Sequence, residues 1–239
     1  MKIRLSVMSL LIVTLHAFSA EPLKVNKREF SLYLDKTRVI YNQNDSSQSL
    51  SAVNKQAYPV LLQAKIMPVN KDDSVNFIVT PPISRLDPGQ QVSLRIIKNK
   101  NIDEDKKESM SYLCINTLPP EKSSNEKGEK NVGINLNVLI STCEKLIYRP
   151  SSLSGSPQTV GAKLSWQSDG GKIIIHNPTP FIMSIGSLTV NGKKVILDDY
   201  ISPQGSLSVN ESAEKGSTVK WTVIADYGGE SAVFTTKLK

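Results

Sequence analysis

The chain has 239 residues, with 29 Lys and Arg against 22 Asp and Glu, a formal net charge of +7, and only two His. Because the lysines lie in runs of mixed sign, the pattern favours a solvated surface over a nucleic-acid interface. No GxSxG, HExxH, GxGxxG or GxxxxGKS/T motif occurs, which disfavours a hydrolase, a zinc protease and a nucleotide-binding enzyme.

Residues 1–20 read as a secretory signal peptide. Two basic residues precede an apolar run over 5–13, and small residues follow it. The run is too short for a membrane anchor, which needs about 20 apolar residues. Cleavage after Ser19 and cleavage after Ala20 both stay open. We expect an exported chain without a membrane anchor, which keeps 27 basic against 22 acidic groups once the signal is removed.

From Phe30 onward the sequence reads as short strands separated by turn clusters. The alternation of apolar residues and the β-branched runs predict strands at 30–34, 37–41, 49–53, 59–67, 75–80, 92–97 and 112–118. Leu86-Asp87-Pro88-Gly89 is predicted as a turn. Strands at this spacing, with almost no helical periodicity, indicate an all-β antiparallel sandwich of immunoglobulin type.

The apolar residues Val132, Ile134, Leu136, Val138 and Ile140 recur at strict period 2. In an extended chain they form one apolar row about 16 Å long, at roughly 3.3 Å per residue. The preceding stretch, Pro119 to Lys130, is too polar to bury much surface, so we expect a mobile connection. The alternation alone fits two cases: a strand packed on its own core, or a strand offered to another polypeptide.

Cys114 and Cys143 are the only cysteines. An even count in an exported chain favours one disulfide over a metal site, and both residues lie in strand-like runs, so we expect the bridge to tie neighbouring strands. His176 is the only histidine after the predicted signal peptide, and we interpret it as structural. We therefore predict neither a metal nor a cofactor.

A Ser/Gly/Pro-rich linker at 151–158 predicts a boundary between domains 21–150 and 151–239. The second domain repeats the β pattern, with strands predicted at 172–176, 181–190, 194–197, 206–209, 219–225 and 232–238. Asn191-Gly192 is predicted to turn a hairpin. Trp166 and Trp221 are predicted to belong to the core of this second sandwich.

Several stretches resemble the periplasmic chaperones of the chaperone–usher pathway (the PapD-like family), which assemble pili and other surface fibres. They follow the family's order along the chain: Leu34–Tyr41, Thr80-Pro81-Pro82 with Arg85–Gly89, Glu108–Tyr112 leading to Leu118-Pro119, Lys145–Pro150, Asn177–Pro180, Ile201–Pro203 and Asp226–Gly229. The resemblance implies two immunoglobulin-like β-sandwich domains in an L-shaped arrangement, with a fibre subunit bound along the first domain and in the cleft.

The resemblance also implies residue roles. Arg38 and Lys145 would hold the C-terminal carboxylate of the subunit, and Glu144 beside Lys145 would partly offset the positive field. The apolar row Val132, Ile134, Leu136, Val138 and Ile140 would be the strand donated to the subunit. Glu108, Arg149 and Asp226 would form an ion network between the domains.

A long insertion before the seventh strand, together with cysteines joining strands six and seven, is similar to the family's long-loop (FGL) subclass. In that subclass Leu23 and Val25 would join the binding surface. The implied function is a periplasmic, non-enzymatic chaperone that binds fimbrial subunits and delivers them to an outer-membrane usher. The alternative is an immunoglobulin-like fibre subunit or adhesin, which should carry an N-terminal donor extension and an incomplete sandwich.

Overall fold

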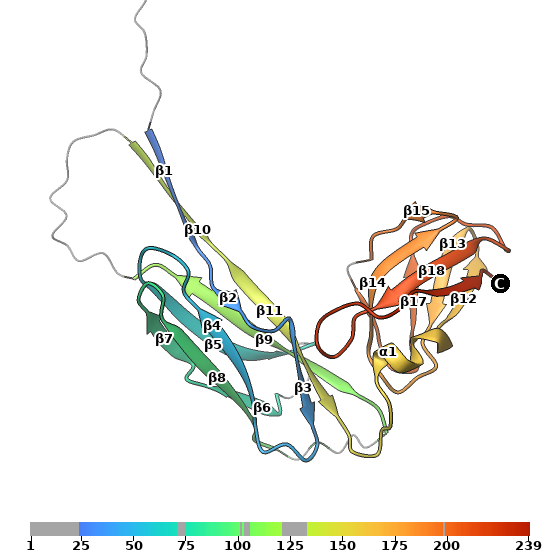
Figure 1. Ribbon diagram of the computed structural model, residues 1–239, viewed down its shortest axis with the longest axis horizontal. Helices are drawn as coiled ribbons and strands as arrows, with labels where there is room; N and C mark the ends of the chain where they lie inside the picture. The colour runs from blue at the N-terminus through green and yellow to red at the C-terminus, as the bar shows by residue number, and fades with distance from the viewer. Residues whose placement is uncertain (1–23, 71–74, 101, 103–105, 121–132, 198) are drawn as a thin grey trace, which may run out of the picture.

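The structure, a computed structural model, describes residues 24–70, 75–100, 102, 106–120, 133–197 and 199–239. It consists of two β-sandwiches set at an angle to one another (Figure 1), in agreement with the expected all-β, L-shaped arrangement. The predicted signal peptide and Leu23 lie outside the described residues. So do Val132 and most of the connection predicted to be mobile.

The first sandwich packs a five-stranded sheet, in the order β3-β11-β9-β5-β7, on a four-stranded sheet, β2-β4-β8-β6. The strands are β2 (Tyr33–Leu34), β3 (Arg38–Asn42), β4 (Gln48–Val53), β5 (Val60–Pro68), β6 (Phe77–Thr80), β7 (Ile83–Leu86), β8 (Gln91–Lys98), β9 (Ser109–Leu118) and β11 (Ser141–Arg149). Alternate residues of both sheets face inward, so the core is built from Leu50, Leu62, Leu94, Leu113 and Leu146, all fully buried.

In the first sandwich one predicted strand has the wrong bounds, and one strand was not predicted. The strand predicted at 30–34 is divided. β1 (Lys24–Phe30) ends at Phe30, and β2 begins at Tyr33, so two residues separate the strands. β7 was not predicted, because its four residues lie between Pro81-Pro82 and the turn before Gly89 and show only one buried side chain, Leu86. It forms because it pairs with β5, a contact that a local pattern does not contain.

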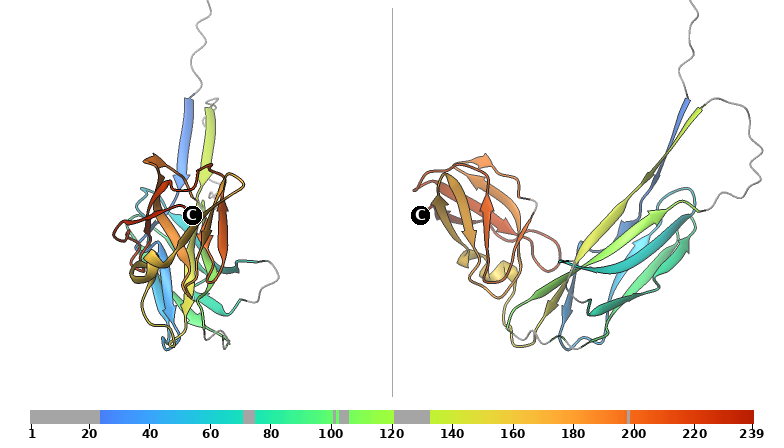
Figure 2. Two further views of the ribbon diagram at one scale, coloured as in Figure 1. Left: turned by 90° about the vertical axis from the view of Figure 1, so that its right-hand side faces the viewer. Right: turned by 180° about the vertical axis from the view of Figure 1, so that it is seen from behind.

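The apolar row does not belong to either sandwich sheet. β10 (Gly133–Leu139) pairs in parallel with β1, and Ile140 separates it from β11. Together β1 and β10, which we call the arm, form a two-stranded ribbon that extends beyond the first sandwich (Figures 1 and 2). Within the described residues neither strand pairs with a third one, so each arm strand keeps one free edge.

The second sandwich contains the sheets β12-β13-β17 and β15-β14-β18-β19, with β16 paired to β14. Its elements are α1 (Pro157–Val160), the 3-10 turn Gly161–Lys163, β12 (Ser165–Asp169), β13 (Lys172–His176), β14 (Met183–Val190), β15 (Lys193–Lys194), β16 (Tyr200–Ile201), β17 (Ser206–Val209), β18 (Thr218–Val223) and β19 (Phe234–Lys237). Asn191 and Gly192 adopt positive φ angles of 49° and 82°, as the predicted hairpin turn requires.

The two tryptophans lie in the core of the second sandwich, as predicted. The ring centroids of Trp166 and Trp221 are 4.9 Å apart, and both side chains are buried. His176 Nδ1 lies 3.1 Å from the Ser206 hydroxyl on the neighbouring strand, a contact that fits the structural interpretation of this residue. β12 was not predicted, since SWQSD is mostly polar and only Trp166 is buried.

Candidate functional site

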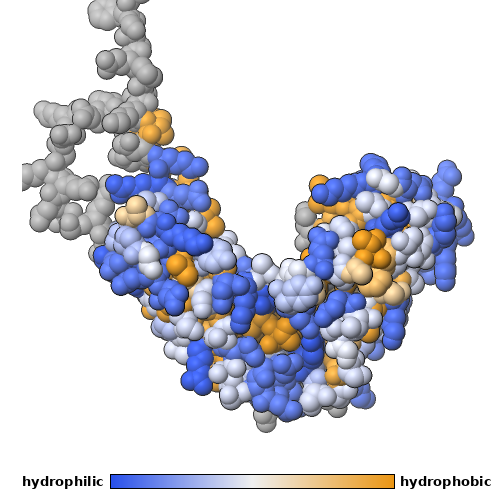
Figure 3. Space-filling model, viewed as in Figure 1, coloured by the Kyte–Doolittle hydropathy of each residue, from blue (hydrophilic) through white to orange (hydrophobic). Residues whose placement is uncertain are grey.

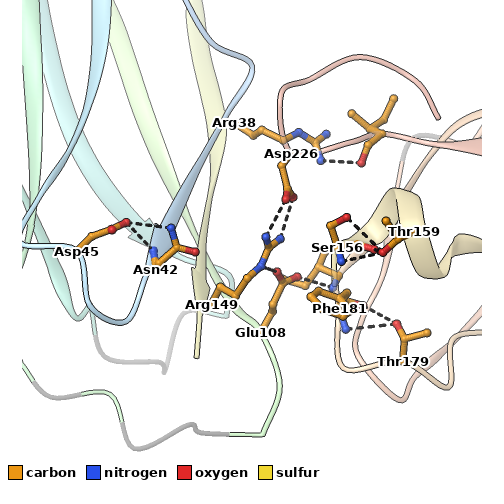
Figure 4. Close-up of polar contacts among 12 residues, drawn as sticks. Arg38, Asn42, Asp45, Glu108, Arg149, Ser156, Thr159, Thr179, Phe181 and Asp226 are labelled. Carbon is orange, nitrogen blue, oxygen red and sulfur yellow. Dashed lines mark hydrogen bonds and ion pairs between the residues drawn. The ribbon is translucent and has the colours of Figure 1, made fainter. Parts of the chain in front are cut away.

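Arg38 and Lys145 lie side by side at the junction of the two sandwiches. They are direct partners in the parallel pairing of β3 with β11. Lys145 Nζ donates to Ser184 Oγ at 2.8 Å. Arg38 Nη1 donates to the Ile224 carbonyl at 3.5 Å (Figure 4). Both long side chains therefore extend from the first sandwich to backbone or side-chain oxygens of the second.

The two cations are only partly compensated. Burial lowers the pKa of Arg38, although Asp226 acts in the opposite direction. Burial also lowers the pKa of Lys145, and the charge of Arg38 lowers it further. Arg38 Nε is buried without a hydrogen-bond partner among the described residues. A bound anion would stabilise both charged forms and satisfy this donor.

There is room for such an anion beside Arg38. A cavity of about 330 Å³ opens at the junction, and its walls include Lys36, Arg38, Ile40 and Asp226. Figure 3 shows hydrophobic residues at the floor of the angle between the sandwiches and along the arm. The junction therefore offers cationic donors next to apolar surface, which suits the end of a polypeptide.

The structure modifies the expectation about Glu144. Neighbouring residues of a strand point to opposite faces, so Glu144 and Lys145 do not share a side. Glu144 instead acts on Arg38: it raises the pKa of Arg38, and Arg38 in turn opposes the burial that raises the pKa of Glu144. The carboxylate that raises the pKa of Lys145 is Asp199. Glu144 therefore partly offsets the positive charge of Arg38 and not that of Lys145.

Glu108, Arg149 and Asp226 come together between the sandwiches. Arg149 Nε lies 2.6 Å from Glu108 Oε1, and its two terminal nitrogens lie 2.7 and 2.8 Å from the Asp226 carboxylate (Figure 4). Glu108 also accepts the Ile182 N–H at 2.7 Å. Burial raises the pKa of Glu108, and the charge of Arg149 opposes this shift. Each carboxylate thus connects one sandwich to the other.

The arm presents its apolar row to solvent. Ile134 and Leu136 are 52% and 47% exposed, while Val138 and Ile140 are half-buried close to the sandwich. Val25 of β1 is the register partner of Ile134 and is also exposed, at 57%. Of the two cases left open by the alternation, a strand packed on its own core does not fit this exposure.

Sequence reasoning did not find several contributors to this surface. Leu139 is 48% exposed on the other face of β10. Ser184 and Tyr200, which contact Lys145, come from the second sandwich, the ring of Tyr200 lying 5.1 Å from Lys145 Nζ. One further contributor, Thr117, did have a local signal, because it is a polar residue at the end of an inward-facing apolar series. Contacts between the sandwiches leave no such local signal.

Cys114 and Cys143 are joined by a disulfide and are direct partners in the antiparallel pairing of β9 with β11. The cysteines therefore tie neighbouring strands, as the sequence predicted. The bridge closes a segment with a sequence separation of 29.

The intact, non-reduced protein is expected to weigh two hydrogen atoms less than its dithiol form. Reduction is expected to lower the free energy of unfolding by about 3 kcal/mol, because it restores chain entropy to the unfolded state. Mass spectrometry and denaturant unfolding with and without reductant check both values. Free thiols in the non-reduced protein would contradict the bridge.

The part of the chain that the structure describes holds neither a candidate metal cluster nor a candidate membrane-spanning helix. Within those residues no group of three or more His, Cys, Asp or Glu side chains is arranged to hold a metal ion. No helix in that part is long and apolar enough to cross a membrane.

Comparison with known proteins identifies the fold family. Residues 31–154 match the family described as "Pili and flagellar-assembly chaperone, PapD N-terminal domain", and residues 159–235 match "Pili assembly chaperone PapD, C-terminal domain". The chain belongs to the PapD-like family of pilus assembly chaperones. This membership confirms the resemblance read from the sequence, and it describes a chaperone, not an enzyme.

Individual members of the family are similar over nearly the whole chain. The chaperone protein AggD of Escherichia coli is 37% identical over 93% of this chain and 91% of its own. Chaperone protein caf1M of Yersinia pestis is 36% identical over 92% of this chain and 90% of its own. Both relatives are named as chaperones, so the alternative of a fibre subunit or adhesin is not favoured.

Solved structures agree with the fold. The E. coli chaperone DraB superposes with a TM-score of 0.78 at 37% identity, over 90% of this chain and 100% of that one. The SafB chaperone of Salmonella enterica, whose structure was determined in complex with the SafA pilin, gives a TM-score of 0.81 at 35% identity, with the same coverage.

Proposed function

We propose that this chaperone binds unassembled fibre subunits in the periplasm, donates β10 to them, and delivers them to an outer-membrane usher. The observation that carries the proposal is the exposed row on β10, a strand with a free edge, in the same molecule as two undercompensated cations. The SafB relative, whose structure is a complex with the SafA pilin, supports a subunit as the partner.

Strand addition follows from the free edge of β10. A subunit that lacks one strand exposes a groove, and an added strand completes it through backbone hydrogen bonds while alternate side chains fill the pockets. Burying one Val, Leu or Ile contributes roughly 1.5–3 kcal/mol. Association and ordering cost about 4–15 kcal/mol, so the row requires help from the backbone ladder and from a second anchor.

Arg38 and Lys145 supply that anchor. The guanidinium of Arg38 can pair bidentately with a carboxylate, and the Lys145 ammonium adds a point charge from the neighbouring strand. The C-terminal carboxylate of a subunit is a partner that every subunit carries. When that carboxylate is anchored, it fixes which subunit residue lies opposite each side chain of the row. The position matters because a slip by one residue turns every side chain of a strand to the other face.

Five further assignments belong to the proposal. Residues 1–20 are the signal peptide that takes the chain to the periplasm, and the domain boundary lies near residue 150. Val25 extends the binding row onto β1, and the arm with its neighbouring disulfide supports the long-loop subclass. Glu108, Arg149 and Asp226 hold the angle between the domains, which sets the second sandwich, with the Ser184 and Ile224 partners of the two cations, relative to the first.

Replacing both Ile134 and Leu136 by serine is expected to weaken subunit capture about 100-fold or more, because two pockets of the subunit lose their apolar occupant. The melting temperature should change little, since both side chains are already exposed. The measurement is coexpression with the small exported proteins encoded beside this chain, followed by affinity titration of the complex that copurifies.

The matched control replaces Ile196 and Val233, two exposed apolar residues of the second sandwich, by serine. It should leave capture unchanged. A collapse of stability in the arm variant, or equal capture by both variants, would remove the row from the binding surface.

A further inference from the structure

The arm leaves the first sandwich at one buried point. β1 ends at Phe30, β10 is followed by Ile140, and Thr117 lies one residue beyond Asn116, the last β9 residue that pairs with β11. The Ile140 N–H donates to the Phe30 carbonyl at 2.9 Å, and the Thr117 N–H donates to the Ile140 carbonyl at 3.3 Å. We call these three residues the arm root.

The Thr117 hydroxyl contacts both arm strands at the root. It donates to the Phe30 carbonyl or to the Ile140 carbonyl, the latter at 2.8 Å, and it accepts the Ile140 N–H at 3.2 Å. A hydroxyl has one proton and two lone pairs, so it can donate to one of the two carbonyls while it accepts the Ile140 N–H. One side chain of β9 thereby connects the end of β1 with the residue that follows β10.

A hydroxyl is unexpected at this position. Leu113, Ile115 and Thr117 form the inward-facing series of β9, and Thr117 is only 4% exposed. Valine has the same shape and would fill the site without bringing a polar atom into the core. A buried hydroxyl is tolerated because it is hydrogen-bonded, so the bonds to the two arm strands explain the residue.

A small rotation at the arm root produces a large displacement at the outer end of the arm. From Leu139 to Ile134 the strand extends about 17 Å, at roughly 3.3 Å per residue, so a rotation of about 10° at the root displaces the outer end by about 3 Å. The displacement is sideways, and hydrogen-bonded strands lie about 4.8 Å apart, so 3 Å is more than half of the distance over which the backbone ladder with a subunit would form. Capture of a subunit therefore depends on the direction of the arm as well as on its side chains.

We propose that Thr117 is a positioning residue for strand donation. Its hydroxyl fixes the direction of the arm by binding the root of both strands, and so it keeps the row aligned with the subunit groove. The proposal rests on the proposed function, in which β10 is the donated strand. Tyr58 provides a second tether, because its hydroxyl donates to the Glu29 carbonyl at 2.5 Å and its ring packs on Phe30 at 5.2 Å.

The test compares Thr117→Val with Thr117→Ser. Valine removes the hydroxyl and keeps the shape, while both root carbonyls retain a backbone donor, so the fold is kept. We expect Thr117→Val to weaken subunit capture about three- to tenfold, the effect of one hydrogen bond, and Thr117→Ser to restore capture to within about twofold of the original. In the free chaperone, amides of β1 and β10 should exchange hydrogen faster in Thr117→Val alone.

Thr222→Val is the matched control. Thr222 is equally buried, and its hydroxyl donates to Glu230 at 2.5 Å in the second sandwich, far from the arm. It should lower the melting temperature as much as Thr117→Val without changing capture or arm exchange. Should Thr117→Val fail to fold, Tyr58→Phe removes the second tether at the same root and is expected to give the same pattern.

Unchanged arm exchange in Thr117→Val would overturn the proposal, as would faster exchange with unchanged capture, because the arm direction would then not matter. Equal loss of capture in Thr222→Val would also overturn it. If the unmodified protein captures no subunit, the proposed function fails, whereas the exchange measurement on the free chaperone still tests whether Thr117 holds the arm.

Discussion

Replacing Arg38 by alanine is expected to reduce subunit capture about 100-fold or more and to leave the chaperone folded. Removing one partner of a buried, hydrogen-bonded charge pair costs about 2–5 kcal/mol or more. Among the described residues Arg38 has no such partner on its Nε, and its burial lowers its pKa, so the free chaperone loses little when the side chain is removed. Affinity titration and thermal unfolding of the same variant measure the two effects.

Arg85→Ala is the matched control, because Arg85 is exposed on the first sandwich and, within the part of the chain that the structure describes, its ion pair is with Asp87 at 3.2 Å. It should leave capture unchanged. Arg38→Lys separates charge from geometry: a lysine keeps the charge but loses the two parallel bonds, so capture should recover only in part. Subunit yields equal to those of the original protein in Arg38→Ala would disprove the anchor role.

Replacing Arg149 by alanine is expected to lower the free energy of unfolding by about 3–5 kcal/mol, the cost of leaving a buried charge unpaired. Glu108 is only 2% exposed and would lose its 2.6 Å contact, while Asp226 would lose both of its bonds to the guanidinium. The contact between the sandwiches should loosen, which small-angle scattering would record as a broader range of interdomain angles. Denaturant unfolding at pH 7 gives the free energy.

The loss in Arg149→Ala should depend on pH. Burial raises the pKa of Glu108 above its usual 4.5, and removing Arg149 removes the charge that opposes this shift. A carboxyl with a raised pKa in the folded state binds protons more readily when folded, so stability falls as pH rises from the ordinary value through the folded pKa. The variant should therefore be closest to the original near pH 4.5 and furthest from it at pH 8.

Adding Glu108→Gln to Arg149→Ala removes the ionisable group. The double variant should lose this pH dependence and regain part of the stability, because a neutral amide is buried more easily than a carboxylate. A destabilisation that is the same at all pH values would mean that Glu108 is not the group left unpaired.

Local patterns predicted most strands well, and their failures have physical causes. β13 was predicted with its observed bounds, because Lys172–His176 contains a compact apolar run bounded by turns. β7 and β12 were missed, because their pairing with β5 and β13 compensates for weak local patterns. The predicted strand that included the apolar row is interrupted at Ile140, where the chain passes from the arm to the sandwich.

The candidate site could be predicted from sequence only through the family resemblance. Arg38 and Lys145 are 107 positions apart, and composition contains nothing that brings them together. The pairing of β3 with β11 places them in register, and the second sandwich adds Ser184 to the contact. The same holds for Thr117, whose two partners come from distant parts of the chain.

The sequence by itself determined that Ile134 and Leu136 share one face of a strand, because alternation along an extended backbone is a local property. It also determined the disulfide pair, since only two cysteines exist. Only the tertiary structure decided which way the apolar face points. Solvent exposure depends on which strands lie beside β10. Among the described strands only β1 pairs with β10, and β1 comes from a part of the chain more than a hundred residues away.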